Sequence, residues 1–288
     1  MGSHIKLLLI EATLQDIYLE ILRRTHFGYF SGETIANFLH AQPHTWLAAA
    51  MGSHTARRGD LASAYLLARL RGLTRNQSEG LDTLYILAKD QRAAEIWLNK
   101  GLFPDQSEIL SPAVLSQDIL HVKDPSEARL VRLWWNLQIA EAPDADSPDS
   151  ASFLNGELSP QSLTLEEAPL QALYLDIIRR QEFNAYEGHA VFEGLIQHRA
   201  LWVAALLDRL TVSDELEGEL HMLWQLRSIQ RSRLHKHDTL YILAKDQEAA
   251  TILVAQPWAS EIGIVQPNRV NKFVDFPAEQ RLVTIWWD

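Results

Sequence analysis

A carboxylate–amine group is the one set of polar residues in this sequence that recurs intact and could carry acid–base chemistry. Its members are Asp82, Lys89 and Asp90, which return as Asp238, Lys245 and Asp246. Two carboxylates within reach of each other can share a proton. If 83–88 is a strand, its ends are roughly 20 Å apart at ~3.3 Å per residue, so Asp82 and Asp90 cannot share a proton. Enzymatic activity is therefore left open, and the residues favour a non-catalytic role.

Histidines supply the next possible chemistry, which is metal binding. His40 and His44 are four residues apart, but Pro43 between them is expected to break the helix that would align them. His235 and His237 have only Asp238 as a nearby carboxylate ligand. Nucleophile-elbow, phosphate-loop and dinucleotide motifs are absent from the sequence. We expect no metal and no cofactor.

An internal duplication organises the chain. Residues 82–91 recur without change as 238–247, an offset of 156 positions (238 minus 82), and flanking residues align at or close to the same offset. We expect repeat domains at 5–138 and 162–288, arranged as an intramolecular pseudo-dimer. Residues 1–4 resemble a vector-derived remnant, and the acidic, proline-containing stretch 139–161 is expected to be a flexible linker.

The first part of each copy predicts helices. Apolar residues recur at helical spacing from Leu14 to Leu22, and again around 35–39. Pro43 suits the first turn of a third helix through Ala50. Asp60 is a suitable N-cap for a fourth. We therefore expect a four-helix N-terminal bundle in each copy.

The second part of each copy predicts strands around one helix. Thr83–Ala88 is apolar on both alternating faces, as in a buried central strand, and Asp90 or Asp246 can cap the following helix. Later strands are expected at 108–110 and 130–135, and at 261–265 and 282–287. The fold class is thus α+β, with each bundle packed on a small sheet that contains one β-α-β unit. The alternative is an all-α fold, with one unbroken helix over 84–100.

Composition restricts the partners. The net charge of −11 argues against a phosphate backbone or an anionic membrane surface, because both need clustered positive charge. No apolar run reaches the ~18 residues of a membrane-spanning helix. Cysteine is absent from the sequence, which excludes disulfides and thiolate chemistry. We expect a cytoplasmic protein that binds neither nucleic acid nor membrane.

The unchanged decapeptide indicates that both copies present the same surface, since the flanking sequence has diverged. The candidate binding residues are Arg71, Asp82, Lys89, Gln91 and Trp134, with Arg227, Asp238, Lys245, Gln247 and Trp286 in the second copy. The function that we predict is a non-catalytic tandem adaptor that engages a protein partner through equivalent surfaces. The alternative is a protein that binds or processes a small anionic ligand, a nucleotide or phosphate, near Arg71 and Asp82 and near Arg227 and Asp238.

Overall fold

A computed structural model describes most of the chain. The described residues are 7–53, 61–99, 101–110, 127–136, 163–183, 185–208, 215–231, 237–258, 261–270 and 276–287. The predicted remnant at 1–4, the linker at 139–161, the cap residue Asp60 and the candidate ligand His235 lie outside these ranges. The predicted domain boundaries stay a prediction.

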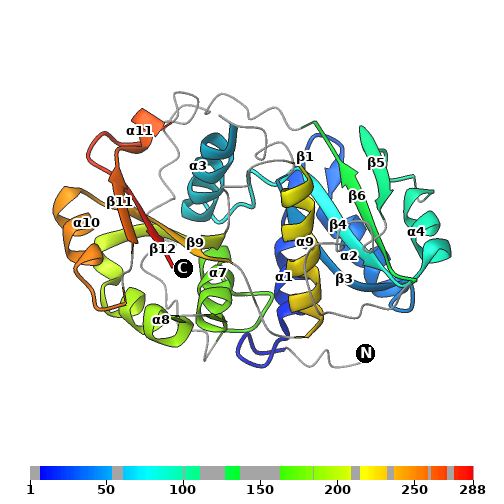
Figure 1. Cartoon of the computed structure of the whole chain (residues 1–288), viewed down its shortest axis with the longest axis horizontal. Helices are drawn as coiled ribbons and strands as arrows, with labels where there is room; N and C mark the ends of the chain where they lie inside the picture. Colours follow the sequence, from blue (N-terminus) through cyan, green and yellow to red (C-terminus); the bar gives the residue numbers. More distant parts are fainter. Residues whose placement is uncertain are drawn as a thin grey trace.

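The described elements of the first half recur in the same order in the second half, which also contains a 3₁₀ turn and a short helix (Figure 1). In the first half they are α1 (Leu14–Arg23), β1 (His26–Phe27), β2 (Phe30–Ser31), α2 (Gly32–Ala41), β3 (Trp46–Gly52), α3 (Leu61–Thr74), β4 (Thr83–Ala88), α4 (Gln91–Leu98), β5 (Gln106–Leu110) and β6 (Arg129–Trp134). In the second half they are α7 (Leu170–Arg179), β7 (Glu182–Phe183), β8 (Tyr186–Glu187), α8 (Gly188–Gln197), the 3₁₀ turn η2 (Arg199–Leu201), β9 (Trp202–Asp208), α9 (Glu215–Gln230), β10 (Thr239–Ala244), α10 (Gln247–Val254), β11 (Glu261–Val265), α11 (Pro267–Val270) and β12 (Arg281–Trp286).

Within the described residues, the strands form two four-stranded antiparallel sheets and two short hairpins. The sheet orders are β3-β4-β6-β5 and β9-β10-β12-β11. The strand–helix–strand unit β4–α4–β5 is split, because β6 lies between its two strands. The decapeptide strand therefore lies inside each sheet, and all six residues of β4 and of β10 are buried.

Local sequence accounts for the elements on either side of the decapeptide strand. Thr13 and Asp16 form a capping box at the start of α1, which buries the predicted stripe from Leu14 to Leu22. The side chain of Asp90 accepts a hydrogen bond from the Ala93 amide at 2.7 Å, which fixes the start of α4. Asp246 caps α10 in the same way. The caps predicted at Asp90 and Asp246 are confirmed.

The predicted four-helix N-terminal bundle is wrong, and so is the all-α alternative. The expected third helix is the strand β3, whose residues pair with β4 from Trp46↔Ala88 to Gly52↔Thr83. Ala48, Ala49 and Ala50 favour a helix intrinsically, but they are fully buried here as part of a sheet. Tertiary pairing has overridden local propensity. The same correction applies to β9 in the second half.

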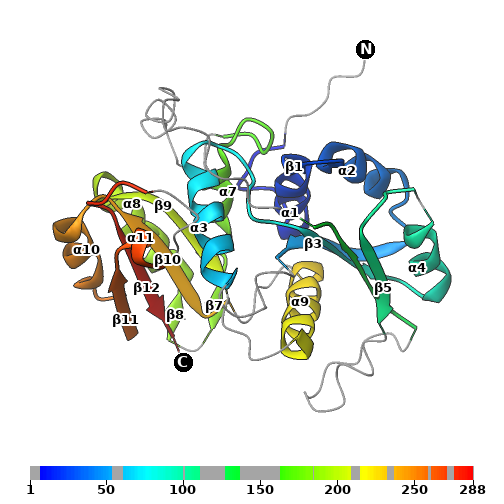
Figure 2. The same ribbon diagram turned by 90° about the horizontal axis from the view of Figure 1, so that it is seen from above.

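The helix that follows β3 or β9 packs on the sheet of the other half. Helix α9 contacts β3, β4 and α1, whereas α3 contacts β9 and α7. Figures 1 and 2 show α3 and α9 on exchanged sides of the molecule. Helices α1, α9, α3 and α7 thus form a central layer between the two sheets, with α4 and α10 on the outer faces. Two helices of this layer come from each half.

Two arginines join the halves reciprocally. Arg24 at the end of α1 donates hydrogen bonds to the carbonyls of Leu165, Glu166 and Ala168, which precede α7. Arg180 at the end of α7 donates to the carbonyls of Leu9 and Ala12, which precede α1. These two arginines therefore hold the two halves together.

Glutamine side chains cover one outer edge of each sheet. The Gln15 amide on α1 donates to the Ala49 carbonyl at 2.9 Å and accepts from the Ala49 amide at 3.0 Å. Gln171 pairs with Ala205 on β9 in the same two-bond pattern. These bonds satisfy backbone groups that an edge strand would otherwise leave exposed. None of the described helices has the length and hydropathy of a membrane span.

Candidate functional site

The ten candidate residues fall into groups at opposite ends of the central strands. Lys89 and Gln91 follow the end of β4, and Lys245 and Gln247 follow the end of β10. All four are exposed. Asp82 precedes the start of β4, roughly 20 Å away at ~3.3 Å per residue. The structure does not bring the two groups together.

A glutamine–arginine pair marks the lysine end of each sheet. Arg129 at the start of β6 donates from Nε to Gln91 Oε1 at 3.0 Å, and Arg281 donates to Gln247 at 2.9 Å. The Arg281 guanidinium also donates to three backbone carbonyls, those of Ala278, Glu279 and Gln280. The repeated glutamine therefore orients an arginine that fixes the turn before the closing strand. This contact gives a structural reason for its identity in both copies.

A groove of about 370 Å³ lies beside this pair in the second half. It is lined by Gln247, Ile264, Val265, Gln266, Arg269 and Arg281. The groove combines two guanidinium groups with two amides and an aliphatic surface. Ile262 and Val265, on the adjacent strand β11, are 46% and 45% exposed.

The opposite end of each sheet is mostly enclosed. Asp82 is fully buried, and its carboxylate accepts hydrogen bonds from Thr83 at 2.7 Å and from the Trp134 indole at 3.2 Å. Asp238 accepts from Thr239 at 2.9 Å, and Trp286 is 37% exposed. The predicted tryptophan anchors thus differ, because Trp134 is less exposed than Trp286.

The two helix arginines have separate surroundings. Arg71 on α3 forms an ion pair with Glu79 at 3.2 Å, and Arg75 pairs with the same carboxylate. Arg227 on α9 is buried, and burial, with the nearby Arg231, lowers the pKa of its guanidinium. Whether any of the ten residues binds a ligand stays a prediction.

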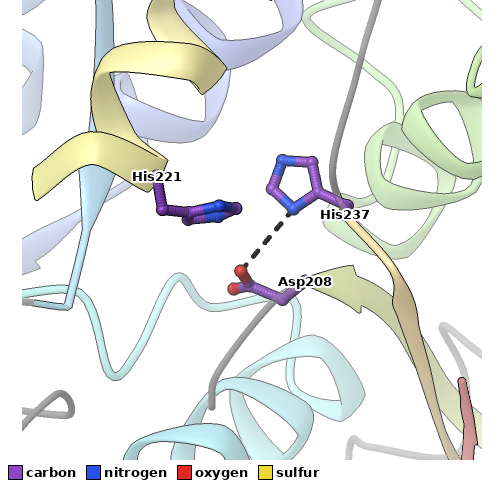
Figure 3. Close-up of side chains that lie close together, drawn as sticks. All are labelled: Asp208, His221 and His237. Atoms are coloured by element: carbon purple, nitrogen blue, oxygen red, sulfur yellow. Dashed lines mark ion pairs between the residues drawn. The ribbon is translucent and has the colours of Figure 1, made fainter. Parts of the chain in front are cut away.

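A third location lies at the junction of the two halves, and of its polar residues the sequence singles out His237 alone. A cavity of about 40 Å³ is bordered by α1, α3, α7 and α9 and by the adjoining ends of β3, β9 and β10. Asp208 ends β9, His221 lies on α9, and His237 stands just before β10. Figure 3 shows the three side chains directed toward one another. Their candidate ligand atoms all lie within 4.8 Å of one another.

An ion pair between the two halves places a carboxylate and a guanidinium group at this junction. Arg69 on α3 pairs with Asp208 Oδ2, and its guanidinium carbon lies 5.8 Å from the centroid of the Tyr174 ring. Burial by itself raises the pKa of Asp208, but Arg69 and the two histidines outweigh it and hold that pKa well below its usual range. Burial lowers the pKa of Arg69, and attraction to Asp208 and Tyr174 more than reverses this. Asp208 is therefore a carboxylate at neutral pH.

The cluster occupies positions where the two copies differ. At the offset of 156, Asp208, His221 and His237 correspond to Gly52, Tyr65 and Leu81 in the first copy. Strand registers agree, because Gly52 pairs with Thr83 as Asp208 pairs with Thr239. Comparing copies for identity could not find this cluster. A search for positions that carry a titratable polar residue in the second copy but not in the first would have indicated the cluster.

No family model matches the chain, and no significant similarity was found to curated proteins or to solved structures. Functional inference therefore depends on the chemistry of the described residues.

Proposed function

We propose that the chain is a non-catalytic protein-binding module whose halves engage extended, acidic segments of a partner protein at the lysine ends of the sheets. The observation that carries this proposal is the groove beside β11, where cationic and aliphatic groups border an exposed edge strand. The proposal extends the expected adaptor role to a stated partner chemistry.

The edge strand supplies the first argument. Among the described strands, β11 is hydrogen-bonded along one side only, to β12. Its side chains include the exposed Ile262 and Val265. An exposed apolar edge is a template for an added strand, and peptide-binding domains use such edges with side-chain pockets for specificity. An extended peptide segment is the ligand that suits this geometry.

Charge supplies the second argument. The chain has a net charge of −11, yet the groove is lined by Arg269 and Arg281. The exposed Lys245 lies two residues before Gln247, which also lines the groove. Arg281 is held in a fixed orientation by Gln247 at 2.9 Å. Fixed guanidinium groups bind carboxylates with little further loss of side-chain entropy. Acidic residues in the partner segment are therefore favoured.

The repeat supplies the third argument. The first half carries Lys89, Gln91 and Arg129 in the same arrangement, next to the half-buried Ile109 and Leu110 of β5. Residues 111–126, which follow β5 in the sequence, lie outside the described ranges. A partner with two suitable segments could engage both halves at once, which raises avidity by ~10²–10⁴ where the linker allows it.

Peptide selection on the immobilised full chain tests the proposal. We expect enrichment of acidic sequences with apolar residues at alternate positions. Their affinity, measured by fluorescence anisotropy, should fall at least ~10-fold in Val265→Asp. Ile252→Asp, which adds the same charge to the exposed face of α10, is the matched control and should bind as the unchanged chain does. Equal affinity for the chain and for Val265→Asp would refute the assignment of the groove.

The alternative function is tested in parallel with ATP and inorganic phosphate. Arg71 is paired with Glu79, and Asp82 is buried against Thr83 and Trp134, so these contacts favour a structural role at that end. We expect no rise in Tm from either ligand. A rise that Arg227→Gln abolishes, without any peptide binding, would replace the adaptor proposal with a small-anion site.

A further inference from the structure

The junction cluster has the composition of a transition-metal site. It combines two imidazoles with one carboxylate, and these are ligands that zinc accepts alongside a bound water. His237 and His221 are 2% and 4% exposed, and Asp208 lies beside them at the end of β9. The ligand atoms come from three different elements, so the fold and not a local motif brings them together.

The hydrogen bonding of His237 is consistent with a bound cation. Neither of its ring nitrogens makes a hydrogen bond within the described residues, although both are buried. Its Nδ1 lies 3.6 Å from Asp208 Oδ1, which is within the distance of an ion pair but longer than a hydrogen bond (Figure 3). Buried polar atoms are nearly always satisfied, and an exception requires an explanation such as a bound water or ion.

An arginine from the other half orients the carboxylate of the cluster. Arg69 pairs with Asp208 Oδ2. Oδ1 remains on the side of His237. Ligating carboxylates are commonly held by a second hydrogen bond of this kind, which fixes their orientation.

The geometry requires only a small contraction. The ligand atoms lie within 4.8 Å of one another. In a tetrahedral zinc site with bonds of ~2.0–2.2 Å, they would lie about 3.3 Å apart. Rotations about side-chain bonds can supply the difference. The adjoining cavity of about 40 Å³ exceeds the ~10–15 Å³ that one water needs, so a water can complete the coordination.

We propose that Asp208, His221 and His237 bind a zinc ion that fastens the exchanged helix α9 to the sheet of its own copy. Asp208 stands at the end of β9 before α9, and His237 stands between α9 and β10. One ligand thus comes before α9, one lies on α9 and one comes after it. A bound ion would link the exchanged helix to the two strands that flank it in the sequence. The first copy has Gly52, Tyr65 and Leu81 at these positions, so one of the two junctions holds the ion.

Zinc titration of the full chain by isothermal calorimetry, after EDTA treatment and dialysis, tests this proposal. We expect one zinc per chain. At zinc concentrations ~100-fold above Kd, we expect a rise in Tm of about 5–10 °C. His237→Leu, which installs the first copy's residue, should weaken binding at least ~100-fold. His40→Ala removes an exposed histidine and is the matched control, with affinity expected to be unchanged.

If His237→Leu fails to fold, the visible absorption spectrum of Co²⁺ bound to the unchanged chain and to Asp208→Asn tests the same ligands. Bound Co²⁺ in the unchanged chain should show the intense visible bands of four-coordinate geometry, and Asp208→Asn should weaken or shift them. The proposal is overturned by any of three results: the folded chain binds no zinc, His237→Leu binds zinc as tightly as the unchanged chain does, or binding depends on His40.

Discussion

A double-mutant cycle across the junction is the sharpest test of how the halves are coupled. Arg69 and Asp208 belong to different copies, and their side chains are 10% and 16% exposed. Removing one partner of such a buried pair leaves an uncompensated charge and costs ~3–5 kcal/mol. We expect Arg69→Gln and Asp208→Asn each to lower the free energy of unfolding by about 3 kcal/mol, near the lower limit because both side chains retain some exposure.

The double variant should lose less than the sum of the two single losses. Neither side chain then carries a charge, and the two amides can hydrogen-bond, so we expect a coupling energy of about 2–3 kcal/mol. Urea unfolding at pH 7, followed by fluorescence of the nine tryptophans, measures each variant. EDTA in the buffer removes any contribution of bound ion. Arg75→Gln is the control, because its partly exposed pairing with Glu79 at 3.2 Å should be worth ~0–1 kcal/mol and Glu79 keeps Arg71 as a partner.

The free energy of unfolding at acidic pH is a second measurement on the same variants. The pKa of Asp208 is depressed in the folded chain, so its stabilisation is present above the ordinary carboxyl pKa of ~3.9 and is lost as the pH falls below it. The advantage of the unchanged chain over Asp208→Asn should therefore shrink on acidification. If the two single losses add within ~0.3–0.5 kcal/mol, the coupling argument is refuted.

Three further substitutions probe contacts described above, each by urea unfolding. Gln171→Ala removes both bonds to Ala205 and should cost about 1–3 kcal/mol, and a loss below ~0.5 kcal/mol would contradict its role at the sheet edge. Asp246→Ala removes the cap on the Ala249 amide and should cost ~0.5–2 kcal/mol, whereas Asp246→Asn should retain most of it. Trp287→Ala empties a buried site with an edge-to-face aromatic neighbour and should cost ~3–5 kcal/mol, and an unchanged midpoint would contradict its burial.

The elements that the sequence predicts correctly are those whose pattern favours one answer over its alternative. Thr83–Ala88 is apolar on both faces and β-branched or aromatic in part, and Asp90 is an efficient cap, so β4 and α4 follow. The pattern of Trp46–Gly52 admits two answers. Its alanines suit a helix, and only pairing with β4 makes the segment a strand. Such pairing depends on residues far along the chain.

The sequence alone predicts neither the exchange of the helices nor the junction cluster. An apolar face on α9 looks the same whichever sheet covers it, so the pattern predicts the helix and not its location. His221 and His237 come together with Asp208 only once that location is known. The signal that was available is the change of Gly52, Tyr65 and Leu81 to polar residues at the equivalent positions of the second copy.

The crossing of α3 and α9 has a consequence for how assembly depends on dilution. When separate chains exchange helices, their association follows mass action, and lowering the protein concentration takes them apart. Here both exchanging segments belong to one covalent chain. Formation of the crossed arrangement is therefore a unimolecular step, and the molecule should keep it at any concentration at which it remains folded.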